Sequence, residues 1–388
     1  MKKAFIISFI LYTTLSSSLN AQDIVVNAKV VDAETHEALP NATISSDADK
    51  NFIANTDGEF CIEIPSTDEL TVSYVGYNPL RIKAGNVEST IKLKPYTIEL
   101  SEVKVLPLKS ILERVVSVIE AETNIYKKQE SNFYYRQTSL NDGECCEYIE
   151  SFLSGYSELA FRQPSMITGR YGALSNTDEK KYSHPGNYYM LSCVSPYART
   201  ISKKSMIFPL IPHYEKLYEI DYDILRDKTD GSSIYKITFT PRPKVKNVIV
   251  KGSIYVDAET YKLLRYEGDI LNEHIVYKNG NRYTANISFS VNYSHRHHFT
   301  EVQNVTVQST YSDNGTSVAI NSTLFNVGKK YYKGKKKLGS FSNLKQRINS
   351  TGYDAQFWND NTIIKRTPME EQVVKMFEKD NVFSNIAE

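Results

Sequence analysis

The chain has few cysteines and no excess charge of either sign, and both shortages narrow what it can be. Four cysteines in 388 residues are too few for a disulfide scaffold. Adjacent cysteines rarely bridge each other, so we expect free thiols, with a bridge from Cys193 to Cys145 or Cys146 as the open alternative. The 46 basic and 45 acidic residues nearly balance, whereas nucleic-acid binding needs clustered positive charge. We therefore expect no nucleic-acid partner.

Long apolar runs are lacking as well. Residues 4–15 are mostly apolar and follow Lys2 and Lys3, but this run is shorter than the roughly 20 residues of a membrane-spanning helix. A charged start, a short apolar run and small residues up to Ala21 are typical of a signal peptide over residues 1–21. We therefore predict an exported protein, periplasmic or associated with the outer membrane of a Gram-negative bacterium, whose mature chain begins near Gln22.

Common catalytic motifs are absent from the sequence. It has no His-Glu-x-x-His, no phosphate-binding glycine loop and no Gly-x-Ser-x-Gly. His298 and Glu301 have the spacing of a zinc carboxypeptidase ligand pair, but no histidine follows residue 298 to supply the third ligand. That class of peptidase is excluded, and we expect a protein without enzymatic activity or cofactor. A third functional hypothesis, beside the two binding hypotheses given below, is an enzyme whose catalytic residues match no known sequence motif.

His295 and His297 are weak candidates for a metal site. They would share one face of a strand, because side chains alternate along it. Two ligands without a nearby third bind a metal weakly, so a polar strand end is the favoured interpretation.

The first thing that the sequence does contain is a run of short strands between residues 22 and 105. Apolar residues alternate with polar ones in "EFCIEI" and "LTVSY", which is typical of strands with one buried face. Asp57 and Gly58 separate two such runs and predict a hairpin turn. Gly76 is expected to end its strand where the backbone must bend, which lets Tyr77 cover the open end of the core.

The stretches "VVDAETHEALPNATI", "NTDGEF", "LTVSYVGY" and "LSEVKV" carry a resemblance to a known family. In this order they resemble the carboxypeptidase regulatory-like domain, a transthyretin-like β-sandwich found at the N-terminus of TonB-dependent transporters that import glycans. The resemblance covers about residues 24–105 and implies an accessory module without catalytic residues. The matching positions are therefore interpreted as fold-determining, chiefly Asp57, Gly58, Tyr74, Gly76 and Tyr77.

The remainder is expected to be mainly β, with a few helices. Helical spacing of apolar residues predicts a helical connector over 106–130, and a capped C-terminal helical tail is expected over 356–388. Between them, residues 131–355 contain long alternating runs joined by short turns, which predicts an antiparallel sheet that curls. The hairpin "GSIYVDAETYKLLRYEGDI" is similar to the strand pairs of half-barrel lipoprotein carriers. Residues 164–215 contain several prolines and are expected to form an irregular insertion.

The leading functional hypothesis is a non-enzymatic envelope protein whose curved sheet shelters an apolar ligand or a protein partner. The residues that could line such a site, or equally form ordinary core, are Ile249, Ile254, Val256, Leu263 and Leu264. The alternative is a glycan-binding accessory protein of a polysaccharide-uptake system, since 28 tyrosines offer rings for sugar stacking.

A lysine-rich stretch suggests a further contact. Residues 314–353 contain eight basic residues and no acidic ones. This stretch could meet anionic headgroups at a membrane surface, although a solvated hairpin tip is the simpler interpretation. The lysines concerned are Lys329, Lys330, Lys333, Lys335, Lys336 and Lys337.

Overall fold

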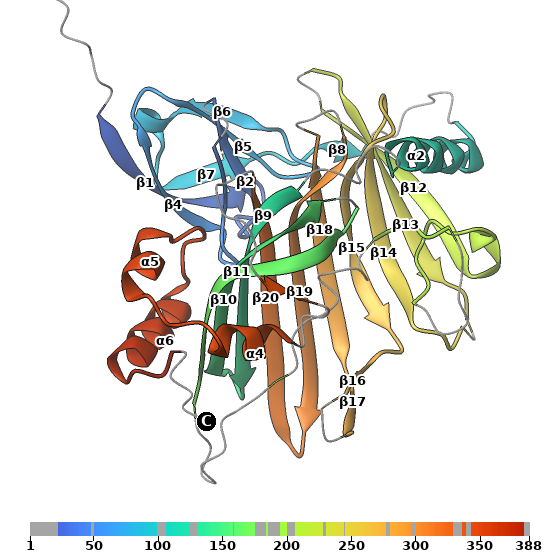
Figure 1. Ribbon diagram of the computed structural model, residues 1–388. Coiled ribbons are helices and arrows are strands. Elements are labelled where there is room, and N and C mark those ends of the chain that lie inside the picture. The colour runs from blue at the N-terminus through green and yellow to red at the C-terminus, as the bar shows by residue number, and fades with distance from the viewer. Residues whose placement is uncertain are drawn as a thin grey trace, which may run out of the picture.

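The protein is described by a computed structural model in which a small β-sandwich packs against one large curved sheet (Figure 1). The residues described are 22–47, 50–98, 106–123, 130–157, 159–174, 184, 195–199, 206–227, 230–243, 245–276, 280–295, 299–328, 336–338 and 343–383. The predicted signal peptide therefore lies outside the described residues.

The N-terminal sandwich consists of two small sheets with an apolar core between them. One sheet has the order β4-β1-β7, and the other has the order β3-β2-β5-β6. The core between them includes Val30, Ile44, Phe60 and Val72, all at most 1% exposed. The strands are β1 (Asp23–Asp32), β2 (Thr43–Ser46), β3 (Asn51–Ile53), β4 (Glu59–Pro65), β5 (Glu69–Ser73), β6 (Leu80–Lys83) and β7 (Thr90–Leu93), with a 3₁₀ turn η1 (Ala84–Asn86) before β7.

Two glycines bend the sandwich where the sequence predicts turns. Gly58 has φ +76°, and a Cβ at this position would lie 2.6 Å from the carbonyl oxygen of Val30. Gly76 has φ +88°, a conformation that side chains other than glycine rarely adopt. The bend after Gly76 lets the Tyr77 hydroxyl donate to Asp32 Oδ2 at 2.7 Å. The predicted turn positions are thus confirmed.

The larger part of the chain forms one sheet of ten long antiparallel strands with a short strand at each edge. Its order is β21-β11-β10-β9-β20-β19-β18-β15-β14-β13-β12-β8, so most neighbours in space are also neighbours in sequence. This confirms the mainly β fold with a curved antiparallel sheet (Figure 1). The strands are β8 (Thr97–Ile98), β9 (Glu130–Asn141), β10 (Glu144–Ser157), β11 (Phe161–Ala173), β12 (Tyr218–Arg226), β13 (Ser233–Pro241), β14 (Ile249–Asp257), β15 (Leu263–Leu271), β18 (Asn286–Ser294), β19 (Glu301–Asp313), β20 (Thr316–Gly328) and β21 (Lys336–Lys337), and β16 (His274–Val276) pairs with β17 (Arg282–Thr284) beside it.

The expectation of an irregular insertion from residue 164 is wrong at its start, because β11 continues to Ala173. Pro164 is tolerated inside this strand because the pairing shifts there, with Ser165 opposite Ser154 but Arg162 opposite Tyr156. A proline at such a bulge removes no ladder hydrogen bond. Much of the rest of the insertion, including 175–183 and 185–194, lies outside the described residues.

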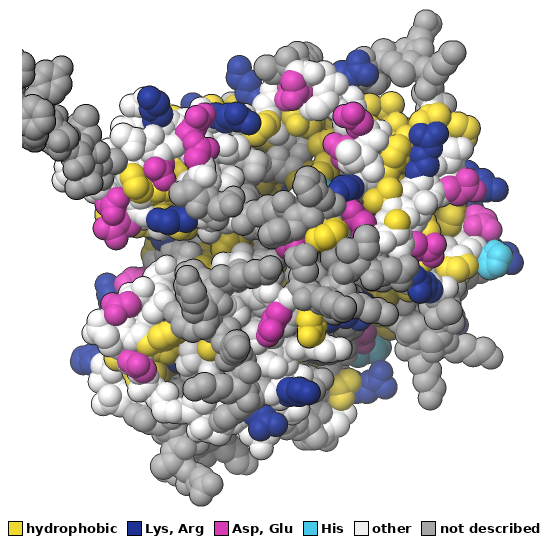
Figure 2. All heavy atoms as spheres, turned by 45° about the horizontal axis from the view of Figure 1, so that its top comes forward, with side chains coloured by type: hydrophobic (Ala, Val, Ile, Leu, Met, Phe, Trp, Pro, Cys, Tyr) yellow, Lys and Arg dark blue, Asp and Glu magenta, His cyan; other side chains and the backbone are white. Residues whose placement is uncertain are grey.

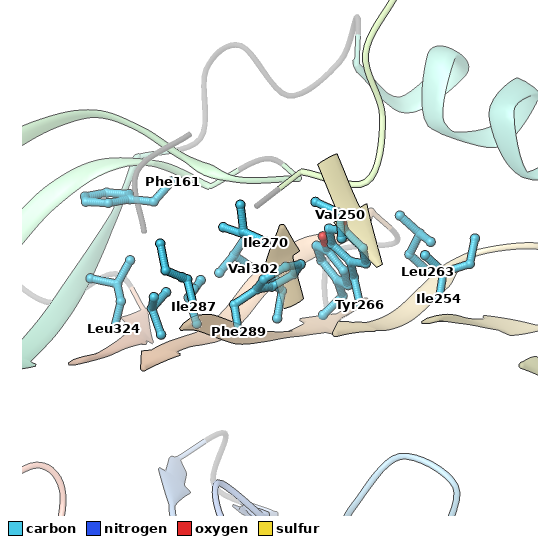
Figure 3. Packing of buried hydrophobic residues seen from close by; sticks show 14 of the residues in the cluster. Phe161, Val250, Ile254, Leu263, Tyr266, Ile270, Ile287, Phe289, Val302 and Leu324 are labelled. Atoms are coloured by element: carbon cyan, nitrogen blue, oxygen red, sulfur yellow. The ribbon is translucent and has the colours of Figure 1, made fainter. Parts of the chain in front are cut away.

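The two faces of the large sheet are covered by different elements. Figure 3 shows apolar side chains such as Tyr266, Phe289 and Val302 gathered on one side of the sheet, with strands of the sandwich on the other side. The apolar side, called here the inner face, is covered by α2 (Leu108–Thr123) and α4 (Leu344–Asn349), whose buried residues belong to the same core. The other side, called here the outer face, carries the sandwich and the C-terminal helices.

The C-terminal tail forms the helices that its sequence predicts. In α6 (Pro368–Lys379), Thr367 and Glu370 form a capping box and Pro368 occupies the first turn. In α5 (Ala355–Asp360), Trp358 is 2% exposed, with its ring 5.8 Å from that of Phe152 on the sheet. The single tryptophan thus anchors the tail to the outer face.

The sandwich is joined to the sheet by more than its linker. Strand β8 pairs with the edge strand β12, with Ile98 opposite Leu225. The Arg265 guanidinium on β15 lies 4.7 Å from the centre of the Tyr74 ring. Lys365, in the tail, donates to Glu59 Oε2 at 2.6 Å. Because three separate parts of the chain hold the sandwich in place, it is docked on the outer face.

Candidate functional site

A groove of about 810 Å³ lies between α2 and the segment that approaches β12. Leu112 and Val116 on α2 form one wall, and residues within 197–199 and 210–215 supply the other. The apolar lining residues are Leu112, Val116, Tyr197, Ala198, Leu210, Ile211, Pro212 and Tyr214, and the polar ones are Lys109, Glu113, Ser117, Glu120, Arg199 and Glu215. This groove has the size and the largely apolar character of a small-molecule site.

The wall opposite α2 is held by backbone hydrogen bonds. Ala198 N donates to Leu210 O at 3.1 Å, and Leu210 N donates to Pro196 O at 2.8 Å. Ile207 continues this arrangement onto the large sheet, where Val250 N donates to its carbonyl oxygen at 3.1 Å. Tyr197 reaches across to α2, where its hydroxyl donates to Glu120. The two walls are therefore linked to each other and to the sheet.

The rim of the groove carries both signs of charge. Lys109 and Glu113, one turn apart on α2, form an exposed ion pair of 3.9 Å. Burial, followed by the nearby carboxylates of Glu215 and Glu113, raises the pKa of Tyr214, so this ring stays neutral at physiological pH. Basic and acidic side chains are also interspersed on the face shown in Figure 2. The rim thus offers cations as well as carboxylates, and the apolar wall contributes most of the recognition that this groove offers.

The five aliphatic residues singled out from the sequence do not line this groove. Ile249, Ile254, Val256 and Leu263 are at most 1% exposed and belong to the inner-face core that also contains Leu112. Leu264 alternates to the outer face and lines a different cleft. Sequence periodicity identified the buried face of the strands but could not show which apolar residues remain beside open space.

That second cleft, of about 610 Å³, separates the sandwich from the outer face of the large sheet. Its lining is more polar than that of the groove. Hydroxyl and amide side chains predominate on both walls, including Ser45 on β2 and Gln303 on β19. The bend at Gly76 and Tyr77 forms part of this lining, so the fold-determining turn also shapes the cleft.

A buried charge network holds the C-terminal tail against the outer face. Glu150 on β10 is 1% exposed and accepts a 2.7 Å hydrogen bond from Arg170 Nε. Arg136 bridges Glu150 and Glu370, at 3.2 and 3.1 Å. Burial alone would raise the pKa of Glu150, but the charges of Arg170, Arg136 and Arg366 outweigh it and hold the pKa far below its ordinary value. Every charged group here has a structural partner, which indicates a role in stability.

Cys146 and His184 form a buried pair that is a candidate for catalysis, because a cysteine beside a histidine can be a nucleophile. Their Sγ and Nε2 atoms lie 3.5 Å apart. Burial raises the pKa of Cys146 to about 11 and lowers that of His184 to about 4. The thiol is therefore protonated and the imidazole neutral at physiological pH, so the pair lacks the thiolate that nucleophilic catalysis requires. No motif in the sequence predicted that these two residues are neighbours.

The remaining candidates from the sequence are placed only in part. His295 Nε2 lies 2.8 Å from the carbonyl oxygen of Leu263, whereas His297 lies outside the described residues. Within the described ranges, the structure contains no group of three potential metal ligands. Of the lysine-rich stretch, the backbone of Lys336 and Lys337 pairs with β11, and Lys337 is exposed. Lys329, Lys330, Lys333 and Lys335 lie outside the described residues.

The described thiols and helices add two observations. Cys61, Cys145 and Cys146 are free thiols, and Cys193 lies outside the described residues. Among the helices that the structure describes, none combines the length and apolar character required to cross a membrane.

Comparison with known proteins identifies the first domain. Residues 26–105 match the family model of the CarboxypepD_reg-like domain, which confirms the resemblance seen in the sequence. This domain is a non-catalytic module. No curated protein matches the chain. One solved structure, a DUF1329 family protein from Desulfovibrio piger, is 13% identical over 58% of this chain and 96% of that one, with a TM-score of 0.22. A TM-score this low does not establish a shared fold.

Proposed function

We propose that this protein is a non-enzymatic, exported binding protein of the bacterial envelope that holds an apolar ligand in the groove beside α2. The observation that carries the proposal is the groove itself, with about 810 Å³ of space and eight apolar lining residues. Removing apolar surface from water contributes about 25 cal/mol per Å², so a chain-like apolar ligand gains most where the walls are apolar. A non-catalytic first domain is in keeping with a binding role.

The polar rim suggests how such a ligand is oriented. Lys109 and Arg199 lie on the same rim as Glu113, Glu120 and Glu215. A fatty acid could place its carboxylate near either cation while its chain lies along Leu112 and Val116. The remaining ligand surface would meet Ile211 and Tyr214, which are buried and half-buried respectively.

The test is the uptake of a fluorescent fatty-acid probe by the full mature chain. The unmodified protein is expected to bind the probe with enhanced fluorescence. Val116→Trp should weaken this binding at least tenfold, because Val116 is a half-buried lining residue and the larger ring would occupy the groove. Titration of both proteins with the probe measures the difference.

Val25→Trp is the matched control. Val25 is 67% exposed on β1, and Figure 1 shows this strand on the opposite side of the molecule from α2. This variant should bind the probe as the unmodified protein does. Absence of uptake by the unmodified protein, or equal uptake by Val116→Trp, would show that the groove is not the binding site.

A further inference from the structure

The polar cleft between the sandwich and the outer face is independent of the apolar groove and has a different chemistry. It measures about 610 Å³ and lies between the faces of two sheets. Two sheet faces that pack together normally exclude water with interdigitated apolar side chains. Here the facing side chains are mostly serine, threonine, asparagine, glutamine and tyrosine. The interface is therefore built as a polar site between two docked units.

The sandwich wall of the cleft is a small array of hydroxyl groups. Thr43 and Ser45 on β2 stand directly opposite Ser73 and Thr71 on β5. All four line the cleft and are half-buried. Because these positions alternate with the buried Ile44 and Val72, the strand pattern that fills the sandwich core also points the hydroxyls into the cleft.

The opposite wall contains a buried amide displaced by a β-bulge. The pairing of β18 and β19 shifts between Asn292 opposite Asn304 and Tyr293 opposite Val302, which leaves Gln303 as the extra residue. Gln303 lines the cleft and is 5% exposed, yet its Nε2 has no hydrogen-bond partner among the described residues. Ser46 Oγ also lacks a partner among the described residues, but Ser46 shares the core-facing side of β2 with Ile44 and pairs with the buried Leu70, so it does not point into the cleft.

The unpaired amide of Gln303 indicates a ligand that supplies its partner. A buried polar group without a hydrogen bond costs about 1–3 kcal/mol, and this cost is recovered when a ligand satisfies it. Among the described residues of the lining, Asp47, which is exposed, is the one that carries a charge. A neutral ligand rich in hydroxyl groups matches this lining better than an ionic one does.

The geometry of the cleft also favours a sugar over a peptide as the ligand. An extended peptide gains most of its affinity from the backbone of a free strand edge, whereas this cleft is bounded by side chains on two sheet faces. Tyr77 and Tyr96 are half-buried in the lining and supply rings of the kind on which a sugar can stack, whereas the Tyr74 ring is already covered by the Arg265 guanidinium. We infer that the cleft between the sandwich and the large sheet is a binding site for a neutral oligosaccharide.

Isothermal titration calorimetry of the full mature chain with maltohexaose, cellohexaose, xylohexaose and laminarihexaose tests this inference. At least one of the four should bind with a dissociation constant below 1 mM. Gln303→Met should weaken that binding at least tenfold, because it removes the amide but keeps the length of the side chain. It should not lower the melting temperature of the free protein, since this amide has no partner to lose.

Gln308→Met is the matched control, because Gln308 is an exposed glutamine on the same strand. It should leave the sugar affinity unchanged. A second variant, Ser45→Trp, fills the cleft from the sandwich wall and should abolish binding even if Gln303→Met folds poorly. The inference would be overturned by binding of none of the four sugars, or by binding that neither variant weakens. Neither result would bear on fatty-acid uptake by the groove, so the two proposals fail separately.

Discussion

At the scale of single residues, Gly76 connects the first domain to the rest of the molecule. Its positive φ of +88° turns the chain after β5, and its carbonyl oxygen accepts a 2.7 Å hydrogen bond from Tyr96 N. The turn presents Tyr74 to Arg265 and Tyr77 to Asp32. One backbone conformation thus serves the closure of the sandwich core, the docking onto the large sheet and the lining of the polar cleft.

Gly76→Val is therefore expected to destabilise the protein by more than about 1 kcal/mol. The space beside the residue is not the reason, because a Cβ would meet only Leu225 Cδ1 at 4.0 Å. The cost comes from the backbone, since a β-branched residue is strained at positive φ. Chemical denaturation of the full chain measures the effect, with Gly352→Val as the control at an open site where φ is not positive. Equal stability of the two variants would contradict the assignment.

At the scale of elements, the C-terminal tail is joined to three strands by a buried and balanced set of charges. Glu150, Glu370 and Glu378 face Arg136, Arg170 and Arg366 in this network. The cost of removing such charges from water is offset only while every member has a partner. The tail is thus fixed by specific pairing as well as by the burial of Trp358 and Phe377.

Glu150→Gln should accordingly destabilise the protein by about 3–5 kcal/mol at pH 7, because it leaves buried arginines without their shared carboxylate. The pKa of Glu150 is depressed in the folded state, so its contribution is complete above the unfolded value of about 4.3 and declines as the pH falls below it. The difference between the two proteins should therefore narrow from pH 7 to pH 3. Urea denaturation at both pH values measures it.

Glu144→Gln provides the comparison on the same strand, because Glu144 is exposed at the start of β10. It should change the free energy of unfolding by less than about 0.5 kcal/mol. A Glu150→Gln variant as stable as Glu144→Gln would show that the network does not hold the tail.

At the scale of the whole molecule, the two β units form one assembly that contains both the apolar groove and the polar cleft. The apolar groove lies on the side of α2, and the polar cleft lies where the sandwich meets the outer face. Docking through β8, Tyr74 and Lys365 makes the second cavity a property of the assembly, since neither unit encloses it alone.

Export is the prediction that belongs to this scale. The first strand begins at Asp23, directly after the predicted cleavage region, which suits removal of residues 1–21. Mature protein purified from its native host is expected to begin at or near Gln22 and to be recovered from the envelope fraction. N-terminal sequencing and fractionation check this, and uncut protein in the cytoplasm would refute it.

The sequence by itself determined the local features of this protein, because they depend on residues close together in the chain. The turns at Gly58 and Gly76, the alternation of the strands and the capped helix α6 were all predictable in this way. The match of residues 26–105 to a known domain has the same origin, since it rests on turn and core positions in a fixed order.

Only the tertiary structure decided where the cavities lie. Val116 and Leu210 border a groove, and Ile254 is sealed in the core, yet all three are equally apolar in the sequence. Gln303 became a cleft residue through a bulge in the pairing of β18 with β19, which no local pattern records. Burial and hydrogen bonding depend on partners distant in the chain, and here Gln303 faces the sandwich across a cleft only because the sandwich docks on the large sheet.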